Sequence, residues 1–179
     1  MKQITASTIQ GISILNPAPS RATDLLEVAA VAGAMTLGAW ARVYLPFSPV
    51  PVTLQTLVVL YAGFAVRPSR AAWGMLLYMA CGTVGLPVLA APFGPTFGYL
   101  LAFVAVPWIA GRTRIPAVGM IAGTLVIYGC GAAWLALWLK CSPGHAVAAG
   151  VLPFLPGDAF KLLIAAKLAE RYRRPSPHQ

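Results

Sequence analysis

The sequence predicts an all-α integral membrane protein: a single bundle of six transmembrane helices with both termini in the cytoplasm. Of the 179 residues, 59% are hydrophobic and only 9% are charged, whereas a typical soluble domain is about 25% charged. Several apolar stretches follow one another along the chain, and about 20 apolar residues match the hydrocarbon thickness of a bilayer. The basic residues gather in alternate connections, which gives the chain an orientation.

The first 23 residues are polar and form the predicted N-terminal tail. They lack a basic start followed by an apolar stretch and a small-residue cleavage site, so a removable signal peptide is not expected. Asp24 followed by Glu27 fits a capping box at the start of a helix. The first span is then predicted at 28–45, and prolines at 46, 49 and 51 end it.

The other five spans follow from further apolar runs, with residues 24–170 as the helical domain and 171–179 as a basic C-terminal tail. The second run is short for a span unless the proline-rich segment before it dips into the membrane. The predicted spans lie at 52–66, from 71 to the interruption at Gly82, Gly85 and Pro87, at 97–111, at 115–139, and from 146 to 167.

Basic residues orient this bundle, because Lys and Arg accumulate in cytoplasmic loops. With the N-terminus inside, only Arg42 and Lys140 lie near outer ends. Ten others fall inside: Lys2, Arg21, Arg67, Arg70, Arg112, Arg114, Lys167, Arg171, Arg173 and Arg174. The net charge of +9 is therefore explained by membrane orientation rather than by a nucleic-acid surface.

Three segments rich in proline and glycine, at 45–53, 85–99 and 152–158, fall in the outer half of this arrangement. Irregular backbone at membrane depth is tolerated only where protein or a water-filled cavity satisfies its polar groups. The outer half of the bundle is therefore predicted to hold a cavity.

Asp158 and Lys161, in the stretch "FLPGDAFK", are the principal candidate site residues. A charge within a span costs about 2.5 to 3.5 kcal/mol on insertion scales, and such residues face the bundle interior and mark functional pathways. Their spacing of three places both on one helical face. The alternative is that Asp158 caps a helix that restarts after the Pro156-Gly157 pair while Lys161 neutralises it.

Thr53, Gln55, Thr96 and Tyr99 are further polar residues near the outer rim. Each of them taken singly is also compatible with a cap, a turn or an interface aromatic. Arg42 is interpreted as a helix-end residue whose charge reaches out to water.

Small residues repeat at a spacing of four in the first span, at Ala30, Ala34 and Gly38. This pattern fits either a partner helix that approaches closely or packing inside the bundle.

Other classes of site leave no pattern in the sequence. It has no GxxxxGK[ST] phosphate loop and no HExxH motif. The two histidines, His145 and His178, are isolated from serines and carboxylates arranged for nucleophilic catalysis. The three cysteines have no ligand spacing and are expected as free thiols. We therefore expect no enzymatic activity, no ATPase of its own, and neither cofactor nor metal.

Three stretches in this order resemble the BioY family, the biotin-specific substrate-binding (S) components of energy-coupling factor (ECF) transporters. They read "ARVYLPFSPVPVTLQTLVVLYAGF", "GLPVLAAPFGPTFGYLLAF" and "FLPGDAFKLLIAAKLA". The resemblance covers about residues 28–170. It implies a multi-pass protein of the cytoplasmic membrane with an outward-facing biotin pocket, which the loop after the first helix covers. It also implies association with a coupling transmembrane subunit and two ATPase subunits.

The resemblance assigns roles to the candidate residues. Asp158 would accept a ureido N–H of biotin, and Lys161 would meet either the carboxylate or the ureido carbonyl. Thr53, Gln55, Thr96 and Tyr99 would complete the polar contacts and the lid, and Ala30, Ala34 and Gly38 would face the partner. The alternatives are an S component for another vitamin, an intramembrane enzyme using Asp158 and Lys161 as acid and base, and a structural membrane subunit.

Overall fold

A computed structural model describes residues 21–87 and 93–173, so most of both predicted tails lies outside the described residues. Most of the described chain is helical. The elements are α2 (Arg21–Trp40), β1 (Arg42–Val43), β2 (Val52–Thr53), α3 (Gln55–Ala65), α4 (Pro68–Thr83), α5 (Phe97–Gly111), α6 (Pro116–Leu139), α7 (Pro143–Gly150), the 3₁₀ helix η1 (Leu152–Phe154) and α8 (Leu155–Arg173).

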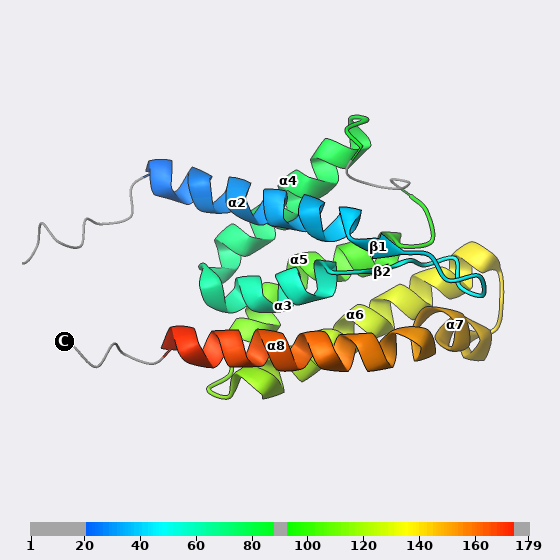
Figure 1. Ribbon diagram of the computed structural model, residues 1–179. Helices are drawn as coiled ribbons and strands as arrows, with labels where there is room; N and C mark the ends of the chain where they lie inside the picture. The colour runs from blue at the N-terminus through cyan, green and yellow to red at the C-terminus, as the bar shows by residue number, and fades with distance from the viewer. Residues whose placement is uncertain (1–20, 88–92, 174–179) are drawn as a thin grey trace, which may run out of the picture.

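The helices run back and forth between two ends of one bundle (Figure 1). The start of α2, the end of α8 and the α3–α4 and α5–α6 turns lie at the left-hand end of that view, whereas β1, β2 and α7 lie at the other end. The connections predicted to be cytoplasmic therefore share one end with the start of α2 and the end of α8. Arg42, on β1, lies toward the opposite end, as the charge pattern requires.

The first span differs from its predicted bounds at both ends. Helix α2 already includes Arg21, so Asp24 lies in its first turn and the capping box is wrong. Its side chain instead forms an ion pair with Arg70 of α4, whose guanidinium also binds Glu27 at 2.7 Å. At the other end α2 stops at Trp40, because the following residues pair as strands.

Strands β1 and β2 form a small antiparallel β-hairpin between α2 and α3, with Arg42 opposite Thr53 and Val43 opposite Val52. We refer to residues 42–53 as the hairpin. Its prolines are compatible with an extended chain but not with a continuing helix. Two-residue strands of this kind left no distinct signal in the sequence, which placed Arg42 and Val43 within the first helical span at 28–45 and predicted irregular backbone at 45–53.

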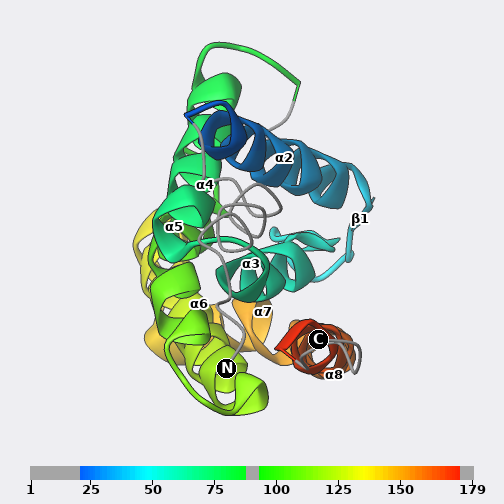
Figure 2. The ribbon, with the colours of Figure 1, turned by 90° about the vertical axis from the view of Figure 1, so that its left-hand side faces the viewer.

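Helix α3 lies at the centre of the bundle, between α2, α4, α5 and α8 (Figure 2). Every one of its residues is buried or half-buried. This position explains how an apolar helix of 11 residues fits a membrane bundle: its neighbours, rather than lipid, surround it. Among the described residues, three segments are long and apolar enough to cross a membrane: Arg21–Trp40, Pro116–Leu139 and Pro143–Arg171.

Glycine allows α3 to approach α5 closely near the α3–α4 and α5–α6 turns. A Cβ built on Gly63 would lie 2.6 Å from the carbonyl oxygen of Pro107, and one built on Gly111 would overlap the carbonyl of Gly63. The two backbones therefore touch directly, which is how small residues promote helix packing in membranes.

The predicted sixth span is broken into α7, η1 and α8. Pro153 and Pro156 lack the N–H groups that a continuous helix needs. Helix α8 consequently restarts at Leu155, and Asp158 lies in its first turn rather than in the middle of a long helix.

Candidate substrate-binding site

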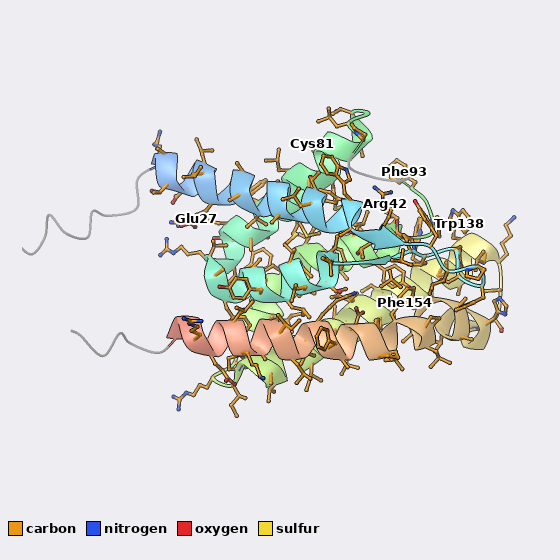
Figure 3. The ribbon with its side chains drawn as sticks, in the orientation of Figure 1. Glu27, Arg42, Cys81, Phe93, Trp138 and Phe154 are labelled. Carbon is orange, nitrogen blue, oxygen red and sulfur yellow. The ribbon has the colours of Figure 1, made fainter. Side chains whose placement is uncertain are left out.

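The end of the bundle opposite the start of α2 and the end of α8 contains a cavity. Residues from all three Pro/Gly-rich interruptions line it, which confirms the predicted cavity. Its wall includes all six polar residues expected at the site, four further polar residues and seven apolar ones. The lining residues are Ala39, Arg42, Val50, Pro51, Thr53, Gln55, Thr56, Tyr78, Thr96, Tyr99, Leu100, Phe103, Ile127, Tyr128, Phe154, Asp158 and Lys161. In Figure 3, Arg42 on β1 and Phe154 at the break before α8 lie on opposite sides of this end.

Asp158 and Lys161 form an ion pair in the first two turns of α8, with Lys161 Nζ 2.7 Å from Asp158 Oδ1. Both are buried, at 6% and 7% exposed, and among the described residues they are the two buried charged ones. A buried charge pair is tolerated only when hydrogen bonds satisfy its remaining donors and acceptors. The N-terminal end of α8 also favours the negative charge of Asp158.

Side chains from two other helices complete the bonding of Asp158. Thr56 of α3 donates its hydroxyl hydrogen to Oδ1 at 3.1 Å, and Tyr128 of α6 donates to Oδ2 at 2.8 Å. The carboxylate therefore points away from its own helix and joins α3, α6 and α8. These contacts favour the interior site over the capping alternative, because all three bonds come from side chains.

Lys161 has each of its three N–H groups directed at an acceptor. Besides Asp158, it donates to the carbonyl of Thr53 at 2.6 Å and to Thr56 Oγ1 at 3.3 Å. The lysine thereby fixes the end of the hairpin to α8.

Gln55, at the start of α3, is 7% exposed and belongs to a second polar group. Its amide nitrogen donates to the hydroxyl of Tyr78 at 2.9 Å, and its amide oxygen lies 3.3 Å from Thr53 Oγ1. Thr53 and Gln55 therefore lie together on one wall of the cavity, as expected.

Tyr99 lines the cavity, but its hydroxyl already donates to the carbonyl of Gly150 at 2.7 Å. Its ring lies against Gly131 of α6, where a Cβ would overlap ring atoms. Tyr99 is thus held between α6 and the end of α7. Thr96, at the N-cap of α5, makes no side-chain cap bond; the connection just before it is held by Trp134, whose indole N–H donates to Gly94 at 3.0 Å.

Sequence reasoning missed four polar residues of the cavity wall: Arg42, Thr56, Tyr78 and Tyr128. Arg42 was interpreted as a helix-end residue, but it lies on β1 and faces the cavity. Only Thr56 carried an available signal, because it follows Thr53 and Gln55 in the same polar cluster.

The small residues of α2 do not share one environment. Ala30 is exposed and Ala34 is half-buried. Gly38 is buried where α2 meets the start of α3, and a Cβ there would lie 3.2 Å from the backbone nitrogen of Gln55. Gly38 therefore contributes to packing inside the bundle, while Ala30 and Ala34 keep the predicted partner role as a hypothesis.

Within residues 21–87 and 93–173, no three His, Cys, Asp or Glu side chains lie together as metal ligands. A broken helix, a charge pair at its restart and a cavity at one end of a helical membrane bundle together define a substrate-binding membrane protein.

Comparison with known proteins gives the family. The model of the BioY family matches residues 8–178, and the chain belongs to this family. It is 35% identical over 140 residues to "Probable biotin transporter BioY" of Pyrococcus horikoshii, covering 73% of this chain and 85% of that protein. It is 30% identical over 167 residues to the protein of the same name in Bacillus subtilis, covering 82% and 88%.

A solved structure has the same fold. This chain is similar, with a TM-score of 0.77 and 20% identity, to the S-component for biotin from an ECF-type ABC transporter, over 90% of this chain and 96% of that one. The expected all-helical membrane fold and the family resemblance are confirmed.

Proposed function

We propose that this protein captures biotin in the cavity for uptake across the cytoplasmic membrane, as the S component of an ECF-type transporter. The observation that carries the proposal is the buried Asp158–Lys161 pair, held from three helices within a mostly apolar cavity. The names of the relatives support the substrate.

Asp158 is proposed to accept a ureido N–H of biotin. A carboxylate offers about four acceptor positions, and three are used by Lys161, Thr56 and Tyr128. The remaining position lies on Oδ2, which has one partner. Because these neighbours fix the carboxylate, the ligand would meet an acceptor that is already oriented.

Arg42 is proposed to bind the carboxylate of biotin. Lys161 has all its donors in use, so it reaches a ligand only by exchanging the longest bond, to Thr56 at 3.3 Å, and is better suited to the ureido carbonyl. Arg42 uses one of its five N–H donors on the hydroxyl of Tyr44, at 3.4 Å. The planar guanidinium of Arg42 can donate two parallel hydrogen bonds to the two oxygens of a carboxylate.

The apolar part of the cavity wall suits the remainder of the ligand. Phe103, Ile127 and Phe154 line the cavity and offer contacts to a thioether ring and an aliphatic chain. Ligand sites typically combine such apolar walls with a few polar groups that fix orientation.

Substitution of the charge pair tests the proposal. Asp158→Asn and Lys161→Ala should each weaken biotin binding more than tenfold, since a lost charge-assisted hydrogen bond costs about 1.5 to 3 kcal/mol. Binding is measured by calorimetry on purified protein in detergent, with membrane insertion checked for each variant. Normal binding by both inserted variants would contradict the proposal.

The choice of ligand separates the remaining alternatives. An S component for another vitamin would bind that vitamin and not biotin in the same assay, and an intramembrane enzyme would convert its substrate rather than release it unchanged. We further propose that a coupling transmembrane subunit and two ATPase subunits supply the transport step. Copurification on a tag from cells that express these subunits tests that part separately.

A further inference from the structure

The last carbonyl groups of α7 lack the partners that an unbroken helix would provide. In a continuous helix the carbonyl of Ala149 would accept the N–H of residue 153, but Pro153 has none. The carbonyl of Gly150 would accept from Phe154, whose N–H instead lies 3.0 Å from the carbonyl of Val151. The break before α8 therefore leaves two backbone acceptors for other donors.

Two side-chain hydroxyls occupy these acceptors. Ser48 Oγ lies 2.7 Å from the carbonyl oxygen of Ala149, and the hydroxyl of Tyr99 lies 2.7 Å from that of Gly150. Buried carbonyl groups are almost always paired. Tyr99 belongs to α5, a fixed part of the bundle, whereas Ser48 belongs to the turn of the hairpin.

Ser48 also organises the hairpin itself. It is 9% exposed, and its oxygen accepts the N–H of Val50 at 3.2 Å. The carbonyl of Val50 lies 3.1 Å from the same hydroxyl, but a hydroxyl has one hydrogen to donate, and the shorter distance assigns that hydrogen to Ala149. Ser48 thus links the backbone of the hairpin to the end of α7.

The hairpin forms one wall of the cavity through Arg42, Val50, Pro51 and Thr53. It is held at two places: at Ser48, by the bond to Ala149, and at its end, by the bond from Lys161 to the carbonyl of Thr53. The bond from Lys161 belongs to the proposed site itself, whereas Ser48 and Ala149 do not line the cavity. The bond of Ser48 can therefore be removed without altering a residue that lines the cavity.

We infer that Ser48 is a positioning residue that latches the hairpin over the bound ligand, by donating its hydroxyl hydrogen to the Ala149 carbonyl that Pro153 leaves free. The inference rests on the proposed function, because it concerns ligand retention in the same cavity. The break in the sixth span thus serves both sides of the site: it places Asp158 at the start of α8 and supplies the acceptor for the latch.

The decisive measurement is the rate of ligand dissociation. Ser48→Ala should raise the dissociation rate of biotin about fivefold, the factor that corresponds to one net hydrogen bond of about 1 kcal/mol. The association rate should change less than twofold, because effects at binding interfaces fall mostly on dissociation. Both rates are measured on the purified full chain by stopped-flow mixing with labelled biotin, followed by a chase with unlabelled biotin.

Ser142→Ala is the matched control. Ser142 is exposed and caps the other end of α7, where its hydroxyl oxygen accepts the N–H of His145 at 3.3 Å. The same substitution there removes a hydrogen bond from the same helix without touching the hairpin. An equal rise in dissociation rate in both variants would contradict the latch.

A measurement without ligand keeps the inference independent of the substrate. In Ser48→Ala the amide of Val50 loses its acceptor, so its hydrogen exchange should quicken about fivefold in protein without biotin. If wild-type protein binds no biotin, the proposed function fails, while the exchange rate of the same amide in Pro153→Ala, which keeps the Ser48 hydroxyl as its acceptor, still decides whether the bond to Ala149 holds the hairpin. Unchanged exchange and unchanged dissociation would overturn the inference, as would a lower unfolding temperature with an unchanged dissociation rate.

Pro153→Ala tests the origin of the free carbonyl. The new N–H would compete with Ser48 for Ala149, so this variant should also speed dissociation. Because the two changes act on one bond, the double variant should be no faster than the faster single variant. Additive increases would contradict the inference.

Discussion

Arg42 and Lys161 are both basic residues of the cavity wall, but their hydrogen bonding differs. Lys161 is buried and gives all three N–H groups to protein acceptors. Arg42 is half-buried on a strand of the hairpin and donates to one tyrosine hydroxyl. The lysine therefore holds the site together, and the arginine retains donors for a ligand.

This difference predicts a dependence on the ligand's own charge. Arg42→Gln should weaken binding of biotin about tenfold, because a hydrogen bond between two charged groups contributes about 1.5 to 3 kcal/mol. It should change the affinity for biotin amide, which has no carboxylate, less than twofold. Calorimetry with the two ligands on wild-type and variant protein measures both effects.

Lys140→Gln provides the control for this test. Lys140 is exposed, lies at the end of α6 and does not line the cavity, so its loss removes a positive charge from the same end of the bundle without removing a contact. Equal weakening of both ligands by Arg42→Gln would show that Arg42 acts on the hairpin and not on the carboxylate.

The sequence identified the site residues that are charged, because the free energy of placing a charge in a membrane span can be judged from the residue type alone. Asp158 and Lys161 stand out because a charged side chain inside an apolar run is costly to insert and usually has a function. Tyr128 and Thr56 do not stand out, since either is common in a membrane helix, and only the three-dimensional approach of α6 and α3 directs them at Asp158. The six predicted polar residues do line one cavity, although the hydroxyl of Tyr99 is engaged with Gly150.

Among the helices and strands, the apolar runs and prolines predicted the existence of each helix more accurately than its ends. The fourth and fifth predicted spans agree with α5 and α6 to within one residue. The end of α2 and the hairpin were missed because pairing between Arg42 and Thr53 depends on contacts made after the chain folds back. The break in the sixth span was also missed: α8 restarts at Leu155 and incorporates Pro156, which is tolerated in a first turn.

Packing between α3 and α5 gives a prediction about stability. Gly63→Ala places a methyl group 2.6 Å from the carbonyl oxygen of Pro107 and 3.0 Å from its Cα. Because these are backbone atoms, the helices must separate, and overpacking of this kind costs about 1 to 3 kcal/mol. We expect a lower unfolding temperature for the purified protein, followed by circular dichroism.

Gly129→Ala is the matched control, since Gly129 is also within a helix, is exposed and has no atom within 4 Å of a built Cβ. Alanine stabilises an open helical position relative to glycine by about 0.5 to 1 kcal/mol. Its unfolding temperature should stay the same or rise. A similar decrease in both variants would mean that the close approach of α3 and α5 does not limit stability.

Across the whole molecule, the two ends of the bundle differ in how they are held. At the end where α2 starts and α8 finishes, backbones touch at Gly63 and Gly111, and Arg70 of α4 binds two acidic residues of α2. At the opposite end, polar side chains surround a cavity and a hairpin forms one of its walls. The end that holds the cavity is therefore separate from the end where the helices pack most closely.

Helix α2 has one face that packs against the bundle and another that is exposed. Val31, Met35 and Ala39 are buried against the bundle, whereas Ala30 is exposed on the other side. A small residue on an exposed helix surface lets a second helix approach closely. The proposed coupling subunit therefore has a surface on α2 that does not include the cavity.

Ala30→Trp is expected to reduce biotin uptake at least tenfold in cells supplied with the coupling and ATPase subunits. The indole would hold a partner helix apart, while biotin binding by the isolated chain should stay unchanged because Ala30 does not line the cavity. Ala133→Trp is the control, because Ala133 is also an exposed alanine, lies on a different helix, α6, and does not line the cavity. Uptake of labelled biotin and binding by the purified variants are measured side by side.

Normal uptake by Ala30→Trp would contradict docking at this surface. Loss of binding by the isolated variant would instead show that Ala30 supports the fold, which would equally remove the partner assignment.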